Sequence, residues 1–185
     1  MTVVVGLPLP YGGRLYNCAA VIAGGDIHGI VPKTHIPGGE KRWFSSGKGL
    51  DETFPAEVLG LTPSEHMPFI SVSTTQMFII GGAKVGVEVC EDFMAPIPTT
   101  GALAVNGAEV ILNLSASNAL AGKRSYRREL VKHRSASCNC IYAYCSAGCT
   151  ESTADMVYAG HSMIAENGKM LVENSKPLDS DYMLV

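Results

Sequence analysis

The sequence has no long hydrophobic run, no excess of charge of one sign and few aromatic residues. Its 185 residues include 14 Lys and Arg against 17 Asp and Glu, and 7% are aromatic. No apolar stretch approaches the roughly 20 residues of a membrane span, and VVVGLPLPYGG near the N-terminus has neither the basic lead nor the cleavage site of a signal peptide. No basic stripe stands out. We therefore expect a cytoplasmic protein that binds neither a membrane nor nucleic acid.

The common metal and phosphate motifs are also missing from the sequence. The five histidines are scattered singly, and SSGKG at 45–49 lacks the upstream glycine and the Ser or Thr of a phosphate loop. Four of the six cysteines lie in 138–149, but their C-x-C-x4-C-x3-C spacing is not the paired C-x2-C of zinc ribbons. A metal site there stays an alternative. We favour reduced thiols that pack as small hydrophobes, with no metal and no disulfide framework.

What the sequence does contain is a series of apolar strands with one clear helix. We expect strands in 2–9, 69–90, 108–117 and 140–148, a hairpin in 17–33 turning at 24–26, and a second hairpin in 161–173 turning at Asn167-Gly168. Residues 37–68 read as a long irregular loop. Apolar strands connected by a helix predict a layered α/β sandwich.

Two helices are expected between the strands. Thr99 caps a short helix that ends before Gly107, and an amphipathic helix runs from Lys123 to about Ala136. The second helix carries a basic run that we interpret as its solvent-facing side, formed by Arg124, Arg127, Arg128, Lys132, His133 and Arg134. The chain fits one domain over 1–185. It starts abruptly with a strand and ends in SDYMLV as another apolar segment opens, so we expect a domain truncated at both ends.

Cys90 is the best candidate nucleophile. It lies where the apolar strand AKVGVEVC meets a polar turn, where following backbone N–H groups can stabilise the oxyanion of a tetrahedral intermediate. Glu91 and Asp92 come next, and their charge opposes thiolate formation unless a cation lies nearby. A buried structural thiol is the alternative reading of this position.

Lys33 is the best candidate for that cation. It follows the strand HGIVP and precedes Pro37, so it can be held rigidly at a strand exit. Glu40, seven residues later, could orient Lys33 or contact a substrate. A solvated lysine and a loop-surface acid are the alternatives. Ser115, Ser117 and Asn118 end another strand, where ligands bind in α/β sheets, although turn chemistry also explains them.

Five ordered segments resemble the nitrilase superfamily of carbon–nitrogen hydrolases, most nearly the glutamine amidotransferase domains of glutamine-dependent NAD synthetases. IVPKTHIP resembles the segment with the family's catalytic lysine, and VGVEVCEDFMAPIP resembles its nucleophile segment. The other three segments are RLYNCAAVI, NLSASNALAGKRSYRR and SAGCTESTADMVYAGHSMIAENGKML. The similarity covers nearly the whole chain in the right order.

The resemblance implies an α-β-β-α sandwich and a Glu–Lys–Cys triad. Cys90 then corresponds to the nucleophile, Lys33 to the oxyanion-side cation and Glu40 to a second, supporting glutamate. Glu91, Ser117 and Lys123 correspond to substrate-binding positions. The implied reaction is hydrolysis of glutamine, which needs no cofactor and supplies ammonia to a synthetase domain. ATP, Mg and deamido-NAD belong to that second domain, and homo-oligomers are the rule in the family.

The sequence departs from the family pattern in several places. The family's general-base glutamate lies on an early strand, and Asp26, in a hairpin turn, is the only acidic residue before Lys33. Gly38-Gly39 replaces a longer aromatic-containing stretch, Thr150 replaces a usual glycine, and no SGGxDS loop follows. We therefore expect these 185 residues alone to have little glutaminase activity. The alternatives are a stand-alone nitrilase-type amidase and a non-catalytic nitrilase-like assembly module.

Overall fold

The first of two β-sheets is built mainly from the N-terminal third of the chain. A computed structural model describes residues 1–174, and its five-stranded sheet has the order β1-β2-β3-β5-β4. The strands are β1 (Thr2–Tyr11), β2 (Arg14–Ala23), β3 (Asp26–Pro32), β4 (Asp51–Pro55) and β5 (Phe69–Ser73). Neighbouring strands are antiparallel except for β3 and β5, which are parallel.

The second sheet has six strands in the order β11-β10-β9-β8-β7-β6. Its strands are β6 (Met77–Ile80), β7 (Ala83–Val89), β8 (Val110–Ser115), β9 (Ile141–Ser146), β10 (Met163–Glu166) and β11 (Lys169–Glu173). The central strands β7, β8 and β9 are parallel, so their carboxyl ends lie at one edge of the sheet. Side chains at that edge are placed to form a site.

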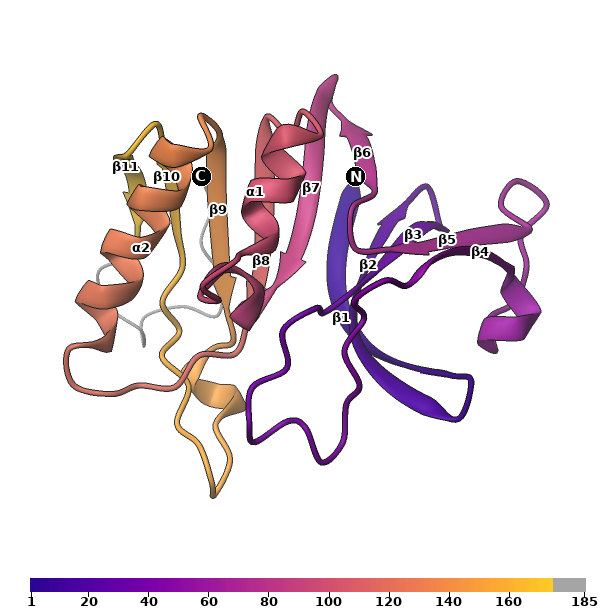
Figure 1. The fold of residues 1–185 in the computed structure, drawn as a ribbon, viewed down its shortest axis with the longest axis horizontal. Helices are drawn as coiled ribbons and strands as arrows, with labels where there is room; N and C mark the ends of the chain where they lie inside the picture. Colours follow the sequence, from indigo (N-terminus) through magenta and orange to yellow (C-terminus); the bar gives the residue numbers. More distant parts are fainter. Residues whose placement is uncertain (175–185) are drawn as a thin grey trace.

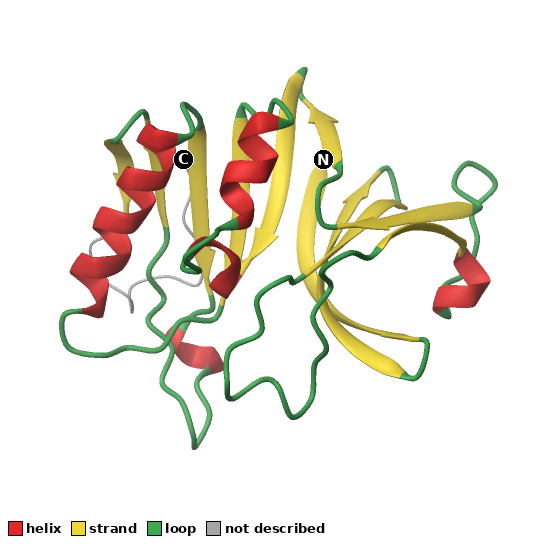
Figure 2. Cartoon of the chain, in the orientation of Figure 1, coloured by secondary structure: helices red, strands yellow, loops and turns green. Residues whose placement is uncertain are grey.

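The two sheets pack face to face through apolar residues that alternate along the strands. Val21 and Val31 of the first sheet meet Val87 and Val89 of the second in one buried cluster. Both α-helices described, α1 (Thr99–Val105) and α2 (Lys123–Ser137), cover the outer face of the six-stranded sheet (Figures 1 and 2). The expected two-sheet α/β fold is thus confirmed, with one of its outer helical layers described.

Three short 3₁₀ turns complete the elements: η1 (Ala56–Leu59), η2 (Cys90–Phe93) and η3 (Cys149–Glu151). The η1 turn packs on the outer face of the five-stranded sheet, where Ala56 and Leu59 join a cluster with Phe54 and Val72. The η2 turn directly follows β7, at the carboxyl edge of the parallel strands.

Most expected elements are confirmed, and three details were wrong. Residues 37–68 are not wholly irregular, because they contain β4 and η1. The N-cap of α1 is Pro98, and the Thr99 hydroxyl donates to Glu88 instead. The basic run on α2 is not simply solvent-facing, because Arg127 is buried. The expected strand opening in SDYMLV lies outside the described residues.

Five cysteines, Cys18, Cys90, Cys138, Cys140 and Cys145, are free thiols. Within residues 1–174, no three His, Cys, Asp or Glu side chains come together as a possible metal site. No helix of the described part has the length and apolar character needed to cross a membrane.

Candidate active site

Cys90 lies in a strained turn at the end of β7. Its φ is +48°, which is uncommon for a residue other than glycine, and such conformations gather at functional sites. The chain turns sharply there from a strand into η2, and Cys90 is half-buried at the margin of the apolar cluster between the sheets. The Asn113 side-chain amide donates to the Cys90 carbonyl over 3.4 Å, which ties the turn to β8.

Lys33 is a buried cation at the end of β3. Only 1% of it is exposed, and its Nζ lies 2.8 Å from both carboxylate oxygens of Glu40. The Asn17 side-chain amide donates to the same carboxylate over 3.3 Å, and the Asn17 carbonyl accepts the Lys33 backbone N–H at 2.8 Å. A buried charge needs such a partner, so Glu40 accounts for the burial of Lys33.

A compact turn carries Glu40 to Lys33. The backbone N–H groups of Trp43 and Phe44 both donate to the Glu40 carbonyl at 2.9 Å, and the Glu40 N–H donates to Pro37. The turn then joins the five-stranded sheet, since Ser45 N–H donates to the Leu15 carbonyl at 2.8 Å. Backbone hydrogen bonds before and after Glu40 therefore fix the turn that carries it.

Asp92 connects the Lys33 segment to the Cys90 turn. Its Oδ1 accepts the backbone N–H of Thr34 at 3.0 Å and that of His35 at 2.7 Å, and its Oδ2 accepts Val89 N–H at 3.2 Å. The residue is 1% exposed. Burial raises the pKa of this carboxyl to about 7, although the hydrogen bond from His35 and the charge of Lys33 act in the opposite direction.

A second buried carboxylate lies two residues before Cys90. Glu88 accepts hydrogen bonds from the hydroxyls of Thr99 and Thr100, at 2.5 and 2.9 Å, and from Tyr142. Burial raises the pKa of Glu88, while these donors lower it. The network fastens the N-terminus of α1 to the strand that presents the thiol.

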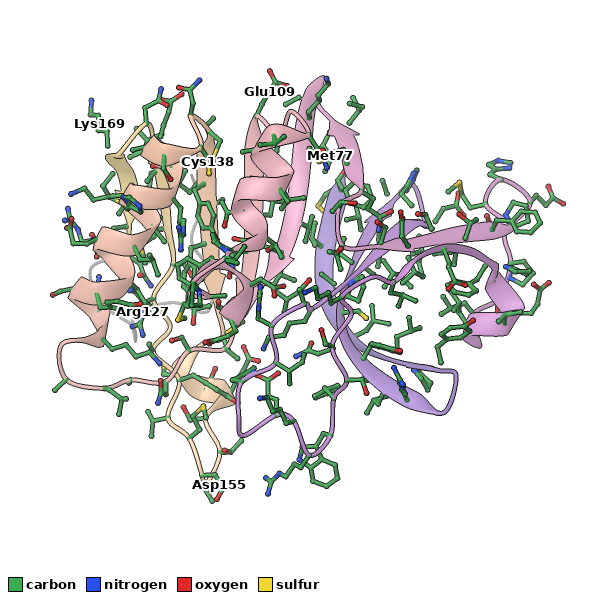
Figure 3. The ribbon with its side chains drawn as sticks, viewed as in Figure 1. Met77, Glu109, Arg127, Cys138, Asp155 and Lys169 are labelled. Carbon is green, nitrogen blue, oxygen red and sulfur yellow. The ribbon has the colours of Figure 1, made fainter. Side chains whose placement is uncertain are left out.

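At the end of β8, the predicted substrate residues form a separate cluster. Ser117 is buried, and its hydroxyl accepts a hydrogen bond from Arg127 over 3.1 Å. Arg127, labelled in Figure 3, also donates to the Asn118 carbonyl at 3.1 Å and to Nδ1 of His161 at 3.3 Å. Lys123, the first residue of α2, donates to the Asn118 side chain.

The six predicted site residues thus fall into three groups. Lys33 and Glu40 form the ion pair. Cys90 and Glu91 belong to the adjacent η2 turn, where Glu91 is half-buried, and Ser117 and Lys123 gather around Asn118. Sequence reasoning missed three residues that the structure adds, namely Asn17, Asp92 and Arg127. The acidic pair after Cys90 was the available signal for Asp92, whereas nothing in the helix pattern marked Arg127 as buried.

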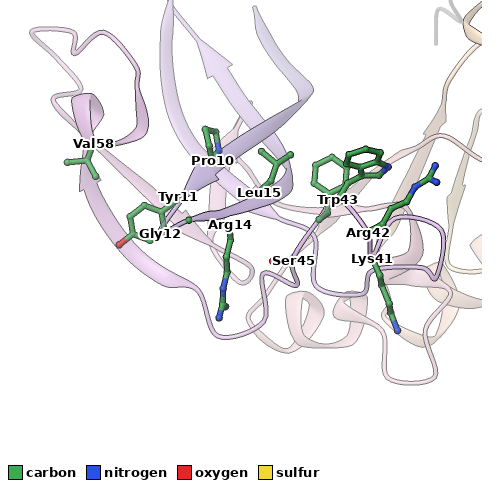
Figure 4. A pocket seen from close by; sticks show the side chains of 12 residues that line it. Pro10, Tyr11, Gly12, Arg14, Leu15, Lys41, Arg42, Trp43, Ser45 and Val58 are labelled. Carbon is green, nitrogen blue, oxygen red and sulfur yellow. The ribbon is translucent and has the colours of Figure 1, made fainter.

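A groove of about 800 Å³ opens elsewhere on the five-stranded sheet. It lies between the β1–β2 turn (10–15), residues 41–45 and Val58, as Figure 4 shows. None of the six predicted site residues lines it. The groove therefore does not coincide with the Cys90 turn.

Comparisons with known proteins match nearly the whole chain. A family model described as carbon–nitrogen hydrolase matches residues 1–178. The chain is 35% identical over 177 residues to the glutamine-dependent NAD(+) synthetase of Mycobacterium bovis, covering 94% of this chain and 25% of that protein. It is 29% identical over 187 residues to the Aquifex aeolicus synthetase, covering 99% of this chain and 28% of that one. The chain thus spans about a quarter of the length of these curated relatives.

Solved structures also match most of the chain. A glutamine-dependent NAD(+) synthetase from Cytophaga hutchinsonii superposes with a TM-score of 0.77 at 27% identity, over 94% of this chain and 27% of that chain. An amidase of the nitrilase superfamily from Nesterenkonia superposes with a TM-score of 0.73 at 20% identity, over 94% of this chain and 57% of that chain. The second likeness concerns the fold alone.

Proposed function

The chain belongs to the carbon–nitrogen hydrolase family, and on that basis we propose that it hydrolyses the side-chain amide of glutamine with Cys90 as the nucleophile. The observation that carries the proposal is the buried Lys33–Glu40 ion pair, which Asp92 joins to the strained Cys90 turn. A fixed cation whose segment is tied to the turn that carries a thiol is suited to amide cleavage. Glutamine is proposed because the relatives that match are glutamine-dependent NAD synthetases.

In the first half of the reaction, the Cys90 sulfur attacks the amide carbon of glutamine. The carbonyl electrons move to the oxygen, and the Lys33 ammonium and the backbone N–H of Glu91 stabilise the resulting oxyanion. When this intermediate collapses, the carbon–nitrogen bond breaks. The proton that began on the thiol ends on nitrogen, so ammonia leaves and a thioester to Cys90 remains.

In the second half, water adds to the thioester carbon and passes through the same oxyanion site. The carbon–sulfur bond breaks, glutamate leaves, and the thiol regains a proton. No electrons are gained or lost overall. Glu40 does not exchange a proton in this scheme, because its role is to hold Lys33 in its charged form and in place.

Glutamine also has an α-amino and an α-carboxylate group that must be bound. We assign these groups to the remaining predicted residues: the Glu91 carboxylate suits the ammonium, while Lys123 suits the carboxylate. Ser117 completes this end of the site, and Arg127 holds its hydroxyl in one orientation.

The released ammonia is proposed to serve an NAD synthetase domain, which would use ATP, Mg and deamido-NAD. The lengths of the relatives support this reading, since the chain matches about a quarter of each. The free thiols of Cys18, Cys90, Cys138, Cys140 and Cys145 fit a reducing compartment, so we place the reaction in the cytoplasm. Assembly into a homo-oligomer is part of the same proposal.

Labelling with a glutamine-mimicking electrophile tests the function without requiring turnover. We expect peptide mass spectrometry to find the label on Cys90, and we expect glutamine to slow the labelling. The exposed thiol of Cys145 is the matched control, because glutamine has no reason to protect it. Equal labelling of the two thiols, unaffected by glutamine, would rule the proposal out.

A second candidate is a nitrilase-type amidase that acts on another small amide. The fold match to the Nesterenkonia amidase, which covers 57% of that chain, favours keeping it. The same labelling reaction separates the two functions. Protection of Cys90 by short aliphatic amides but not by glutamine would favour the amidase.

A further inference from the structure

We propose that Asp92 is a positioning residue that sets Lys33 relative to Cys90. The inference rests on the proposed function, in which Lys33 stabilises charge beside the Cys90 thiol. Asp92 itself does not touch substrate in this proposal. It acts through the two backbone segments that carry the reacting groups.

The geometry places Asp92 between the two sheets. Lys33 follows β3 of the five-stranded sheet, whereas Cys90 follows β7 of the six-stranded sheet. One carboxylate accepts backbone N–H groups from both sides: those of Thr34 and His35 at 3.0 and 2.7 Å, and that of Val89 at 3.2 Å. Thr34 directly follows Lys33, His35 is one residue further on, and Val89 directly precedes Cys90.

The other contacts of Lys33 do not reach the Cys90 turn. Its backbone N–H donates to Asn17, its carbonyl accepts Gly47 N–H, and its ammonium binds Glu40. All three partners lie within the first 47 residues. In the described part of the chain, the hydrogen bonds that join 33–35 to the η2 turn all end on Asp92.

The chemistry of the side chain fits this role. An ionised carboxylate has two acceptor oxygens and no donor, so it can accept all three N–H groups at once. The isosteric amide of asparagine has one acceptor oxygen, and its NH₂ group would face at least one backbone donor. Asp92→Asn therefore keeps the size of the side chain while loosening one of the two segments.

A double-variant cycle tests whether Asp92 acts through Lys33. Alkylation of Cys90 by iodoacetamide is followed by peptide mass spectrometry across a range of pH in the parent, Asp92→Asn, Lys33→Ala and the double variant. A nearby cation favours the thiolate, so Lys33→Ala should slow alkylation by about 10-fold or more at neutral pH. Asp92→Asn should slow it several-fold and shift the pH profile in the same direction.

The decisive result is the double variant, which should be no slower than Lys33→Ala alone. Asp51→Asn, at an exposed position of β4, is the matched control and should react like the parent. If Asp92→Asn does not fold, as judged by circular dichroism, the cycle is run with Asp92→Glu. That variant keeps the charge, displaces the carboxylate and should show the same dependence on Lys33.

The outcomes separate this inference from the proposed function. If Lys33→Ala leaves Cys90 alkylation unchanged, the function proposed for the ion pair fails and the inference fails with it. If Lys33→Ala slows alkylation while the Asp92 variant matches the parent, or if the two effects multiply, only the positioning role is overturned.

Discussion

The ammonium of Lys33 lies 2.8 Å from each carboxylate oxygen of Glu40, yet the two partners differ in burial. Lys33 is 1% exposed and Glu40 is 33% exposed. Water therefore reaches the carboxylate more easily than the ammonium. Among the described residues, Glu40 is the one acidic side chain that accepts a hydrogen bond from the Lys33 ammonium, and it is carried by a turn of the chain.

Glu40→Gln is expected to lower the rate of the chemical step more than it weakens substrate binding. The glutamine amide keeps one acceptor oxygen but removes the negative charge opposite Lys33, so the Lys33 ammonium can move. A displacement of about 1 Å can lower the rate about 100-fold. Because little turnover is expected of these residues alone, the measurement is labelling of Cys90 by the glutamine-mimicking electrophile: its maximal rate should fall, with a smaller change in the electrophile concentration that gives half of that rate. Glu57→Gln, at an exposed position of η1, is the control. A variant with the parent's maximal labelling rate would contradict this role of Glu40.

Gly47→Ala is expected to destabilise the fold near Lys33. An added Cβ would lie 2.5 Å from the Cβ of Pro32 and 3.1 Å from the Lys33 carbonyl oxygen. Overpacking of this kind costs about 1–3 kcal/mol, which urea denaturation can measure. Gly38→Ala is the matched control, because nothing lies within 4 Å of its added Cβ. Equal stability of the two variants would show that Pro32 and Lys33, at the end of β3, can shift to accommodate the added Cβ at little cost.

The pH dependence of stability should carry a contribution from Asp92. Its pKa rises from 3.8 to about 7 on folding, so the folded state binds this proton more tightly than the unfolded state. The contribution is present at acidic pH and is lost as the pH rises from about 4 to about 7, with a slope of at most about 1.4 kcal/mol per pH unit.

Asp92→Asn removes that titration, so its free energy of unfolding should fall less steeply with rising pH than the parent's. Urea denaturation at several pH values between 4 and 8 measures the difference. If the free energies of unfolding of the parent and of Asp92→Asn change in parallel with pH, then Asp92 has the same pKa in the folded and the unfolded state.

Arg127→Lys should destabilise the protein more than the same change at the next residue of α2. Arg127 is buried and makes hydrogen bonds to Ser117, Asn118 and His161 that a lysine cannot reproduce. A loss of about 1.5–3 kcal/mol is expected from these charged hydrogen bonds. Arg128 pairs with Glu129 and Glu173 nearer the surface, so Arg128→Lys should lower the thermal unfolding temperature less than Arg127→Lys does when the two variants are measured together.

Local patterns in the sequence were enough to place most of the strands, the helix α2 and the position of the Cys90 thiol at the end of a strand. Cys90 ends an alternating strand and Lys33 follows an apolar one, and both patterns are contained in about ten neighbouring residues. The strand β4 was missed because its sequence, DETFP, is mostly polar. Among residues 1–174 its one strand partner is β5, which begins 18 residues after β4 begins.

Long-range contacts explain the other residues that sequence reasoning missed. The partners of Asp92 lie 57 and 58 residues away, so no local pattern reveals them. Arg127 lies in a helix rich in basic residues, where its neighbours Arg124 and Arg128 are partly exposed. Arg127 is distinguished only by its hydrogen bonds to Ser117, which follows β8, and to His161.

Because Lys33 and Cys90 follow strands of different sheets, the reactivity proposed for Cys90 would depend on the docking of those two sheets. Each sheet can pair its own strands before the two sheets dock. Lys33 and Cys90 are brought together only when the two sheets pack face to face. Contacts between distant parts of a chain form slowly. A nascent or partly folded chain would thus carry an ordinary cysteine at position 90, and the nucleophile proposed above would arise only in molecules whose two sheets have already packed together.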